Sequence, residues 1–530
     1  MLAITSRALR LSGLLLIALL FSIPLAPPTP VHAATLTVDT LTDEKDDECV
    51  NDCSLRDAIA LAESNVGPDT IEFDVAGTIT LNPALDRLQA LCDGLTVIDG
   101  TTAPTYAGTP VVAIDGSNMS GLPGIQPGIA IYSDENAVLG LTIHSFPDGC
   151  IEIDVASGNT IEHNVLSDCG NGVMMSGAST GNDIRDNYIG TNLTGMSAWG
   201  NSYTGIFLNN PPGLSGPTGN YIEDNVISGN YTWGIVLWGD QTYENWIQGN
   251  FIGVAADGVS PLGNAGAGIW VTEGSFENHI GGALEGDGNI IAYNASIIPN
   301  TGIVITGQDS DGNRISHNSI YDNTDLGIDL GDDGVTCDSP SEDGPNDFMP
   351  CPVINSATTS LVTGTTCPNC IVEVFIADPD PSGYGEGRTF LGDTETTDGN
   401  FTVPVSGVAD CDWLTATAIG QNDDYGNTSE FALNVQVPCG SQEEHNRSRR
   451  TPTPTPTATP EATETPLPPP PPLPTPIEAI GPLVVPPTTG EGPASGGSSW
   501  VGPALLFGAG SALAIGSFCL RAPKGRRRGG

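Results

Sequence analysis

The segments Asn159-Thr160-Ile161-Glu162-His163-Asn164 and Asn182-Asp183-Ile184-Arg185-Asp186-Asn187 are two copies of one pattern, Asn-x-Ile-x-x-Asn. The pattern recurs at residues 220–225, 245–250, 289–294 and 313–318, and a weaker copy begins at Asn136. Self-similarity at a regular spacing is typical of repeat architectures, in which each repeat stacks on its neighbours. This pattern therefore decides the fold.

A second marker, Gly-Ile or a close variant, follows each copy. The markers are Gly172, Gly205, Gly234, Gly268, Gly302 and Gly327, with Cys150 in the first place. Successive copies are 23 residues apart from Asn159 to Asn182 and 25 apart from Asn220 to Asn245. Longer spacings contain insertions at residues 190–201 and 253–264, which begin after an isoleucine and end in Gly-Asn. A coil of 23–25 residues with loop insertions accounts for the series.

Apolar runs such as Ile235-Val236-Leu237 and Ile303-Val304-Ile305 are too short for helices and predict short strands. Strands at the same place in successive coils pair in parallel, so their first and third residues face a shared core. Asparagine suits a ladder at the bend, where its amide satisfies turn backbone, and glycine suits the other corner. A β-propeller is excluded because its blades need about 40–50 residues. The sequence predicts an all-β, single-stranded parallel β-helix.

Residues 95–335 resemble the pectate-lyase-like superfamily of right-handed parallel β-helices. The segment Cys53-Ser54-Leu55-Arg56-Asp57-Ala58-Ile59 resembles the signature of the CSLREA N-terminal domain of secreted bacterial β-helix proteins, with Asp57 in place of the usual glutamate. Ser54 and Asp57 also form a capping box for a helix with one apolar face. We expect this helix to cover the open N-terminal end of the coil.

After the last coil, residues 353–438 alternate short strands with turn clusters, which predicts a small antiparallel sandwich of immunoglobulin type. The expected strands are residues 372–376, 401–405, 414–419 and 431–437. Residues 381–387 and 426–431 resemble immunoglobulin-like modules that follow such β-helices.

Both ends of the chain carry targeting signals. Arg7 and Arg10 precede an apolar run, and Val31-His32-Ala33 ends the segment just before Ala34, which predicts a secretory signal peptide. Residues 500–520 contain no charge and precede a basic tail, which predicts a membrane segment with a cytoplasmic tail. The body is therefore expected to be exported and held at the cell surface.

A Thr-Pro and Pro-Pro spacer at residues 451–476 leads to Pro486-Pro487-Thr488-Thr489-Gly490. This segment is similar to the LPxTG sorting signal through Pro487, Thr489 and Gly490, although Pro486 stands where leucine is expected. Attachment by a sortase and a plain membrane anchor both remain open.

These signals predict seven regions along the chain. They are the signal peptide (1–33), an N-terminal cap (34–94), the β-helix (95–350), the sandwich (351–440), the spacer (441–499), the membrane segment (500–520) and the basic tail (521–530).

The chain carries a formal net charge of −47. Six of its 63 acidic residues lie beyond residue 440, so 57 remain before it, against only six basic residues in 34–440. Such a surface repels nucleic acid and anionic lipid and favours neutral ligands or divalent cations. Solubility outside the cell explains the same charge without any ligand. We expect a monomer that does not bind nucleic acid.

Cysteines outside the membrane segment are expected to form disulfides, because the body is exported. The expected pairs are Cys49 with Cys53, Cys150 with Cys169, and Cys337 with Cys351. Structural bridges are also expected among Cys367, Cys370, Cys411 and Cys439. Eleven such cysteines are an odd number, so one thiol, with Cys92 the candidate, is expected to stay reduced.

The superfamily contains polysaccharide lyases and hydrolases, so the resemblance requires a test for catalytic residues. The Gly-His-Gly and Arg-x-Lys motifs of polygalacturonase-like hydrolases are absent from the sequence. A lyase needs a basic residue, and the β-helix offers only Arg185 and Arg314. His163 and His317 share one repeat position, which favours a structural role. No catalytic residue is assigned.

Calcium is the only cofactor that the sequence suggests. The loop at residues 332–347 is acidic and contains no base, with Asp332, Asp333, Asp338 and Asp343 as candidate ligands. An ordinary solvated acidic loop explains the same residues.

Outward positions of the predicted strands carry apolar and aromatic side chains where water-exposed residues are expected. Phe207, Trp238 and Trp270 follow the glycine markers, and Tyr221 and Trp246 follow the first asparagine of their coils. Exposed aromatic strips mark contact surfaces, and sugar faces stack on flat rings. Alternatively, the two insertions fold over this face.

Three functions remain open from the sequence. The first is non-catalytic, adhesin-like binding of a glycan or another surface. The second is a polysaccharide lyase or glycoside hydrolase with its site in the long loops. The third is a structural stalk.

Overall fold

The computed structural model describes residues 33–65, 67–211, 213–294, 301–337, 344–378, 381–420 and 426–439. Within these ranges no helix has the length and apolar character needed to cross a bilayer. The expected leader up to residue 32, the spacer with its sorting motif, the membrane segment and the basic tail lie outside the described residues.

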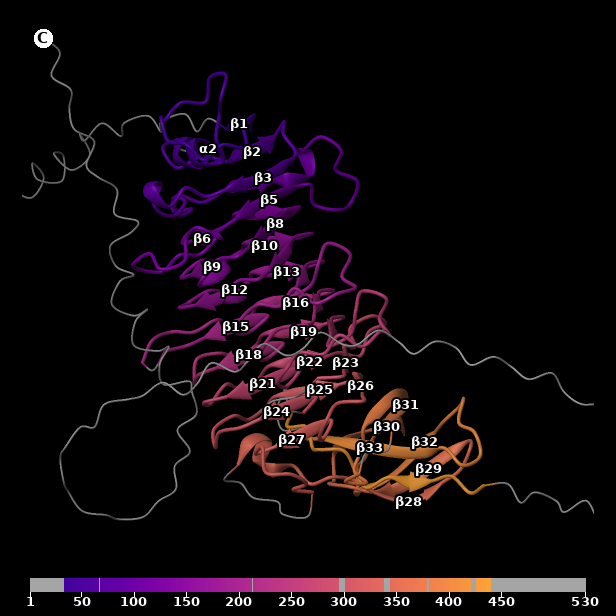
Figure 1. Ribbon diagram of the computed structural model, residues 1–530. Coiled ribbons are helices and arrows are strands. Elements are labelled where there is room, and N and C mark those ends of the chain that lie inside the picture. The colour runs from indigo at the N-terminus through magenta and orange to yellow at the C-terminus, as the bar shows by residue number, and fades with distance from the viewer. Residues whose placement is uncertain are drawn as a thin grey trace, which may run out of the picture. The chain divides into compact units, whose positions relative to one another are not determined.

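Three long parallel sheets form the body, and one strand of each sheet is added per coil (Figure 1). Sheet A runs β1 (Ala34–Val38), β2 (Asp69–Phe73), β4 (Thr96–Asp99), β7 (Ala137–Leu139), β10 (Thr160–Glu162), β13 (Asp183–Arg185), β16 (Tyr221–Glu223), β19 (Trp246–Gln248), β22 (His279–Gly281) and β25 (Arg314–Ser316). Sheet B runs β3 (Gly77–Thr80), β5 (Val112–Asp115), β8 (Leu141–His144), β11 (Val165–Ser167), β14 (Tyr188–Ile189), β17 (Val226–Ile227), β20 (Phe251–Ile252), β23 (Ile290–Ala292) and β26 (Ser319–Tyr321). Sheet C runs β6 (Ile129–Ile131), β9 (Gly149–Asp154), β12 (Asn171–Ser176), β15 (Ile206–Asn209), β18 (Ile235–Trp238), β21 (Ile269–Thr272), β24 (Ile303–Ile305) and β27 (Ile328–Leu330).

Register explains why the coil is stable. The isoleucine of each Asn-x-Ile-x-x-Asn copy pairs with its equivalent in the next coil, as Ile161 does with Ile184 and Ile184 with Ile222. These side chains are fully buried, while their strand neighbours point outward. Identical rows of aliphatic side chains thus build one continuous core. The predicted all-β, right-handed parallel β-helix is confirmed.

Asparagine ladders line the corners as expected. In the first ladder, the side-chain amide of Asn159 donates to Oδ1 of Asn182 at 2.9 Å, and that of Asn182 donates to Asn220 at 2.9 Å. The same oxygens accept backbone N–H groups, so each buried asparagine satisfies its own side chain and a turn. A second ladder contains Asn164, Asn187, Asn225, Asn250, Asn289 and Asn318.

A third ladder was not predicted, and it corrects one repeat. It contains Asn201, Asn230, Asn264, Asn294 and Asn323, at the corner between sheets B and C. The copy at residues 289–294 therefore joins the second and third ladders, and Asn278 fills the first ladder in that coil. Two insertions vary the spacing to this corner, which hides its periodicity in the sequence.

At the N-terminal end, the parallel sheets already begin at Ala34, so the coil continues through the boundary expected at residue 95. Helix α2 (Leu55–Ala62) packs on β1 and β2, and the Ser54 side chain accepts from the Asp57 N–H, so the predicted cap at Ser54 is confirmed. Arg56, only 4% exposed, forms a two-pronged pair with Asp43 at 2.7 and 2.9 Å. The short 3₁₀ turns are η1 (Pro83–Leu85) and η2 (Gly100–Thr102).

At the C-terminal end, two antiparallel sheets enclose a second core. One sheet contains β28 (Val353–Ala357), β29 (Leu361–Thr365) and β32 (Asn400–Pro404). The other contains β31 (Gly387–Glu395), β30 (Cys370–Ala377), β33 (Trp413–Gly420) and β34 (Val435–Gln436). A 3₁₀ turn, η3 (Pro345–Phe348), precedes them. Val362, Val374, Phe401 and Leu414 share this core, so the region is a small sandwich. Its immunoglobulin type stays a prediction.

Glutamates of the sandwich satisfy the last coil of the β-helix. Glu386 accepts the N–H and the side-chain amide of Asn323 at 3.1 and 2.9 Å and so ends the third ladder. Glu430 accepts the Leu330 N–H at 3.0 Å, and Glu373 accepts the His317 N–H at 2.9 Å. The three glutamates are at most 2% exposed. The sandwich therefore closes this end of the solenoid.

The three expected disulfides are present: Cys49–Cys53, Cys150–Cys169 and Cys337–Cys351. Cys367–Cys370 and Cys411–Cys439 are the further bridges. Cys92 is disulfide-bonded as well, so the expectation of one reduced thiol is wrong. Whether a cysteine is paired depends on which cysteine lies beside it in space. Whether the number of cysteines is odd or even does not show this.

Candidate functional site

The outward face of sheet C carries the apolar row that the sequence suggested. Glu152, Met174, Phe207, Val236, Trp270, Val304 and Asp329 pair in register from strand to strand along this row. Val236 and Val304 are buried, whereas Phe207 and Trp270 are partly exposed. The row therefore combines buried valines with accessible aromatic rings. An acidic residue stands at each end of the row.

Four rings on this face contact one another and form what we call the sheet C aromatic strip: Phe207, Trp233, Trp238 and Trp270. The Phe207 and Trp238 rings are 6.5 Å apart and edge-on, and Trp238 lies 6.3 Å from Trp270 in a similar geometry. Trp233, which the sequence did not single out, lies 4.9 Å from Trp270. All four side chains are partly exposed. Such contacts hold the rings in place relative to one another.

The Trp270 ring is also held by a polar contact. Its Nε1–H donates to the Thr306 hydroxyl at 2.9 Å, and that hydroxyl donates to Thr272 at 2.8 Å. Both threonines come from the second outward row of sheet C. The indole is therefore oriented by neighbouring coils rather than by a loop.

The two insertions do not cover the sheet C aromatic strip. Gly195 of the first insertion lies against the outward Tyr188 ring, and Gly258 of the second lies against Phe251, both on sheet B. The insertions also join each other, because the Ala256 N–H donates to the Gly195 carbonyl at 3.0 Å. The alternative in which they bury the aromatic face is therefore wrong. Their length is used to cover the neighbouring sheet.

Tyr221 and Trp246 lie on the outward face of sheet A, so they form a separate surface. Tyr221 is 42% exposed and pairs in register with Trp246. Trp246 stacks on the His279 ring at 3.8 Å with nearly parallel planes. Burial lowers the pKa of His279, with a smaller contribution from Arg314. A neutral imidazole stacked on indole makes this a packed surface.

An acidic group at the N-terminal end of the outward row of sheet C was not predicted as a site. Glu152 is 4% exposed and accepts a hydrogen bond from the Tyr132 hydroxyl at 3.0 Å. Burial raises the pKa of Glu152 to about 7, and the charge of Asp154 adds to the rise. Arg87 lies 5.9 Å from the centre of the Tyr132 ring. A carboxyl group that stays protonated near neutral pH is a candidate proton donor. Sequence spacing could have placed Glu152 and Asp154 on one face, but not Arg87 beside Tyr132.

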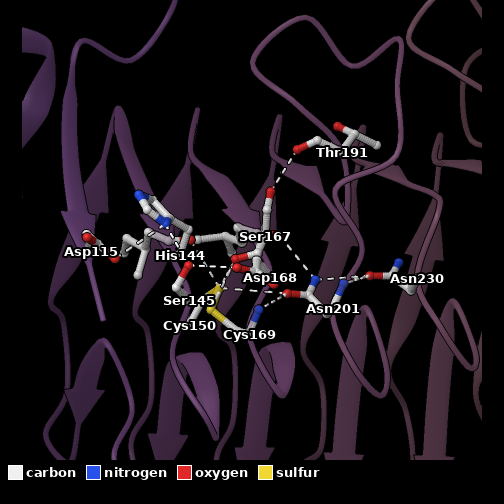
Figure 2. Close-up of a disulfide and its surroundings, with 12 residues drawn as sticks. Asp115, His144, Ser145, Cys150, Ser167, Asp168, Cys169, Thr191, Asn201 and Asn230 are labelled. Atoms are coloured by element: carbon white, nitrogen blue, oxygen red, sulfur yellow. Dashed lines mark hydrogen bonds and ion pairs between the residues drawn. A yellow bond between two sulfur atoms is a disulfide. The ribbon is translucent and has the colours of Figure 1, made fainter. Parts of the chain in front are cut away.

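Histidine, serine and aspartate also meet near the Cys150–Cys169 disulfide (Figure 2). Nδ1 of His144 lies 3.0 Å from the Ser145 hydroxyl and 3.8 Å from Asp115. The Ser145 hydroxyl donates to Asp168 at 2.7 Å. A catalytic triad needs serine and aspartate on opposite ring nitrogens, whereas here both approach Nδ1. This group therefore orders the coil.

The same view shows how the disulfide joins the ladder. Figure 2 shows Cys169 next to Asn201, with Asn230 on the other side of Asn201. The Asn201 side-chain oxygen accepts the Cys169 N–H at 3.0 Å, so Cys169 takes the position before the first asparagine of the third ladder. Cys150 takes the place of a corner glycine in sheet C. The bridge therefore ties two successive coils together at the corner between sheets B and C.

Among the described residues, two groups of side chains are spaced to hold a metal ion, but one of them, Cys337, Cys351 and Glu430, contains a disulfide and offers no thiolate. Glu162, His163 and Asp186 place one ligand atom each within 4.8 Å of the others. Glu162 already pairs with Arg185 at 3.1 Å, and this positive charge weakens cation binding there. His317, at the equivalent repeat position, pairs instead with Glu373 at 3.1 Å.

Of the predicted calcium ligands, Asp332 and Asp333 are exposed, and Asp338 and Asp343 lie outside the described residues. The Asp332 N–H donates to Asp329 at 3.0 Å. Burial raises the pKa of Asp329 to about 7, and the charge of Glu430 adds to it. The described part of this loop is thus folded against the last coil, and calcium binding stays a prediction.

The fold and this face define a β-helix protein with an aromatic strip on one of its three sheets. Residues 93–252 match the family model of the right-handed β-helix region. No curated protein matches the chain in sequence.

Three solved structures illustrate the similarity. An alginate lyase from Paenibacillus sp. is 15% identical, covers 56% of this chain and 99% of its own, and has a TM-score of 0.32. A mannuronan C-5 epimerase module from Azotobacter vinelandii is 17% identical, covers 51% and 82%, and has a TM-score of 0.31. A tailspike capsular polysaccharide depolymerase from Acinetobacter baumannii bacteriophage Fri1 is 10% identical, covers 70% and 71%, and has a TM-score of 0.21. The fold assignment itself is based on the sheet topology and the family model.

Proposed function

We propose that the protein binds an elongated, neutral glycan along the sheet C aromatic strip and does not cleave it. One observation carries this proposal: Phe207, Trp238 and Trp270 contact one another on consecutive coils and remain partly exposed. Sugar rings present flat apolar faces that stack on such side chains. Because the strip runs across successive coils, an extended chain fits it better than a single sugar.

Charge selects the class of glycan. The chain has a formal net charge of −47, and acids stand at both ends of the outward row. An anionic polysaccharide would be repelled over its whole length. A neutral polysaccharide avoids this cost and still gains the stacking contacts.

Export and anchoring are part of the same proposal. A signal peptide ending at Ala33 and a span at residues 500–520 would present the β-helix outside the cell. The spacer at residues 441–499 would then hold it away from the membrane, whether the anchor is the span itself or a sortase linkage at Thr489. Five disulfides between described residues in the range 49–439 support an oxidising location.

The test is retention on a panel of immobilised polysaccharides, with and without added Ca²⁺. We expect retention on a neutral polysaccharide, and at least a tenfold loss of affinity in Trp238→Ala and in Trp270→Ala. Trp246→Ala is the matched control, because it removes the same side chain from sheet A. Loss of affinity in the control alone would move the site to sheet A and contradict the proposal. Retention of no polysaccharide would favour the structural stalk.

Glycan hydrolysis is a second candidate, favoured by Glu152. Its pKa of about 7 suits a general acid, and Asp154 lies on the same face. Against this role, Glu152 is only 4% exposed and a catalytic acid must reach its substrate. Release of reducing ends from a polysaccharide, abolished by Glu152→Gln, would establish this activity.

A further inference from the structure

A buried carboxylate, that of Asp69, lies at the start of sheet A, where later coils have the asparagines of the first ladder. Asp69 is 1% exposed, and its Oδ1 accepts the backbone N–H of Ala34 at 2.8 Å. Ala34 and Asp69 are register partners in β1 and β2. Asn65 donates to the same Oδ1 at 2.7 Å. The Oδ2 atom is buried and has no hydrogen-bond partner among the described residues.

Comparable rungs elsewhere are built differently. Inside the first ladder, the backbone N–H of one coil donates to a neutral asparagine side chain of the next coil. The Asn136 N–H, for example, donates to Oδ1 of Asn159. At the far end of the solenoid, the first ladder ends on another asparagine, Asn346, and a carboxylate replaces asparagine only at the end of the third ladder, where both oxygens of Glu386 accept hydrogen bonds. A neutral acceptor would therefore be enough for the backbone N–H of Ala34. With this donor, the Oδ2 atom of Asp69 remains without a partner.

The partner that would complete this site is a positive group with more than one proton. Ala34 is also the residue at which the leader is expected to be cut, after Val31-His32-Ala33. Hydrolysis of the Ala33–Ala34 peptide bond by an exported-leader peptidase consumes one water. It leaves a carboxylate on Ala33 and an amino group on Ala34, which takes up a proton at neutral pH.

We propose that Asp69 is the receptor for the new N-terminus of the processed chain, and that its carboxylate pairs with the Ala34 α-ammonium. The ammonium has three N–H donors where the unprocessed chain has one, so it can reach Oδ2 as well as Oδ1. Processing thus converts a hydrogen bond into an ion pair at the edge of sheet A. The ion pair fastens β1, the first strand of the solenoid, onto β2.

The first experiment measures where the mature chain starts and how its N-terminus reacts. Mass spectrometry of the exported full-length protein should find Ala34 as the first residue. The amino group is then probed with limiting acetic anhydride at pH 7. Lys45 is the internal reference, because it is exposed and is the only lysine in residues 34–440.

An ordinary α-amino group has a pKa near 8 against about 10.4 for lysine, so it reacts first at neutral pH. We expect the reverse order in this protein, with Lys45 acetylated before Ala34. Asp69→Asn should restore the ordinary order, while Asp74→Asn, an exposed acid just after β2, should not. A start site other than Ala34, or an α-amino group that reacts before Lys45 in the unaltered protein, would overturn the proposal.

A second measurement separates the ion pair from a general role of Asp69 in folding. Residues 34–530 are prepared in detergent beginning at Ala34 or with Ala33 retained before it. Asp69→Asn should lower the Tm by a few degrees in the first chain and leave it unchanged or raise it in the second, where asparagine suits an amide. Equal effects in both chains would mean that Asp69 serves only the backbone, which contradicts the proposal.

Discussion

The two ends of the β-helix are closed by different means. At the N-terminal end, α2 and the residues before it fold back on β1 and β2, and the Arg56–Asp43 pair is buried inside this cap. At the C-terminal end, a separate sandwich supplies Glu373, Glu386 and Glu430 to the last coil. Both solutions cover a sheet end whose backbone groups would otherwise lie open to pairing with another chain.

The difference between interior and end rungs follows from donors and acceptors. An interior asparagine must accept from the preceding coil and donate to the next one, and its amide does both. The last rung only has to accept. A carboxylate offers more acceptor sites than an amide, which explains why Glu386 follows Asn323. The first ladder, by contrast, ends on Asn346, whose amide also donates back to the Asn313 carbonyl at 2.8 Å.

The largest effect is expected from Asp43→Ala in the N-terminal cap. It leaves the Arg56 guanidinium, 4% exposed, without its carboxylate partner, and removing one member of a buried pair costs about 3–5 kcal/mol. Arg56 also donates to the carbonyls of Leu85 and Arg87, so the loop over the cap should loosen too. Urea unfolding measures the loss. A change below 1 kcal/mol would show that the cap does not depend on this pair.

At the opposite end, Glu386→Ala should cost about 1–3 kcal/mol, because the buried N–H and amide of Asn323 lose their acceptor. Glu386→Gln keeps an acceptor oxygen and should recover part of the loss. Hydrogen exchange at the Asn323 amide gives a local readout: it should become faster in the alanine variant. Unchanged exchange would mean that the sandwich does not protect the last coil.

The pH dependence of stability compares the two acids at the ends of the outward row of sheet C. Burial raises the pKa of both Glu152 and Asp329 to about 7 in the folded protein, above their unfolded values. Ionisation of these two carboxyl groups is therefore less favourable in the folded state. Their contribution to the free energy of unfolding is fully present below about pH 4 and is lost as the pH rises through 7. Glu152→Gln should remove on the order of 1–2 kcal/mol of the difference in unfolding free energy between pH 5 and pH 8. A variant that retains the whole difference would contradict the raised pKa of Glu152.

The smallest effect is expected at an exposed contact between the last coil and the sandwich. Arg388 pairs with Asp322 at 2.7 Å and with Asp378 at 2.8 Å, and the Arg388 and Asp322 side chains are both more than 40% exposed. Exposed pairs contribute little, so Asp322→Ala should change the unfolding free energy by less than about 0.5 kcal/mol. It also serves as the control for Asp43→Ala. A loss of more than 1 kcal/mol would mean that this surface pair supports the junction.

The sequence by itself determined the coil, the inward isoleucine rows, stacking of the recurring asparagine in a ladder, the Ser54 cap and three disulfides. Each of these follows from spacing along the chain: Ile161 and Ile184 are one coil apart, and Cys150 and Cys169 are 19 residues apart, which is less than the length of one coil. It also indicated Phe207, Trp238 and Trp270 as outward residues, because strand alternation fixes which side chains share a face.

Only the tertiary structure decided which features meet across irregular spacings. Insertions that occur in only two of the coils hid the third ladder, and they cover sheet B rather than the aromatic strip. The Glu430 carboxylate reaches the Leu330 N–H across 100 residues, and Asp69 reaches Ala34 across 35. A repeat fixes contacts between equivalent positions, because one coil predicts the next. It carries no information about the ends, where the repeat stops and each backbone group must find a partner of another kind.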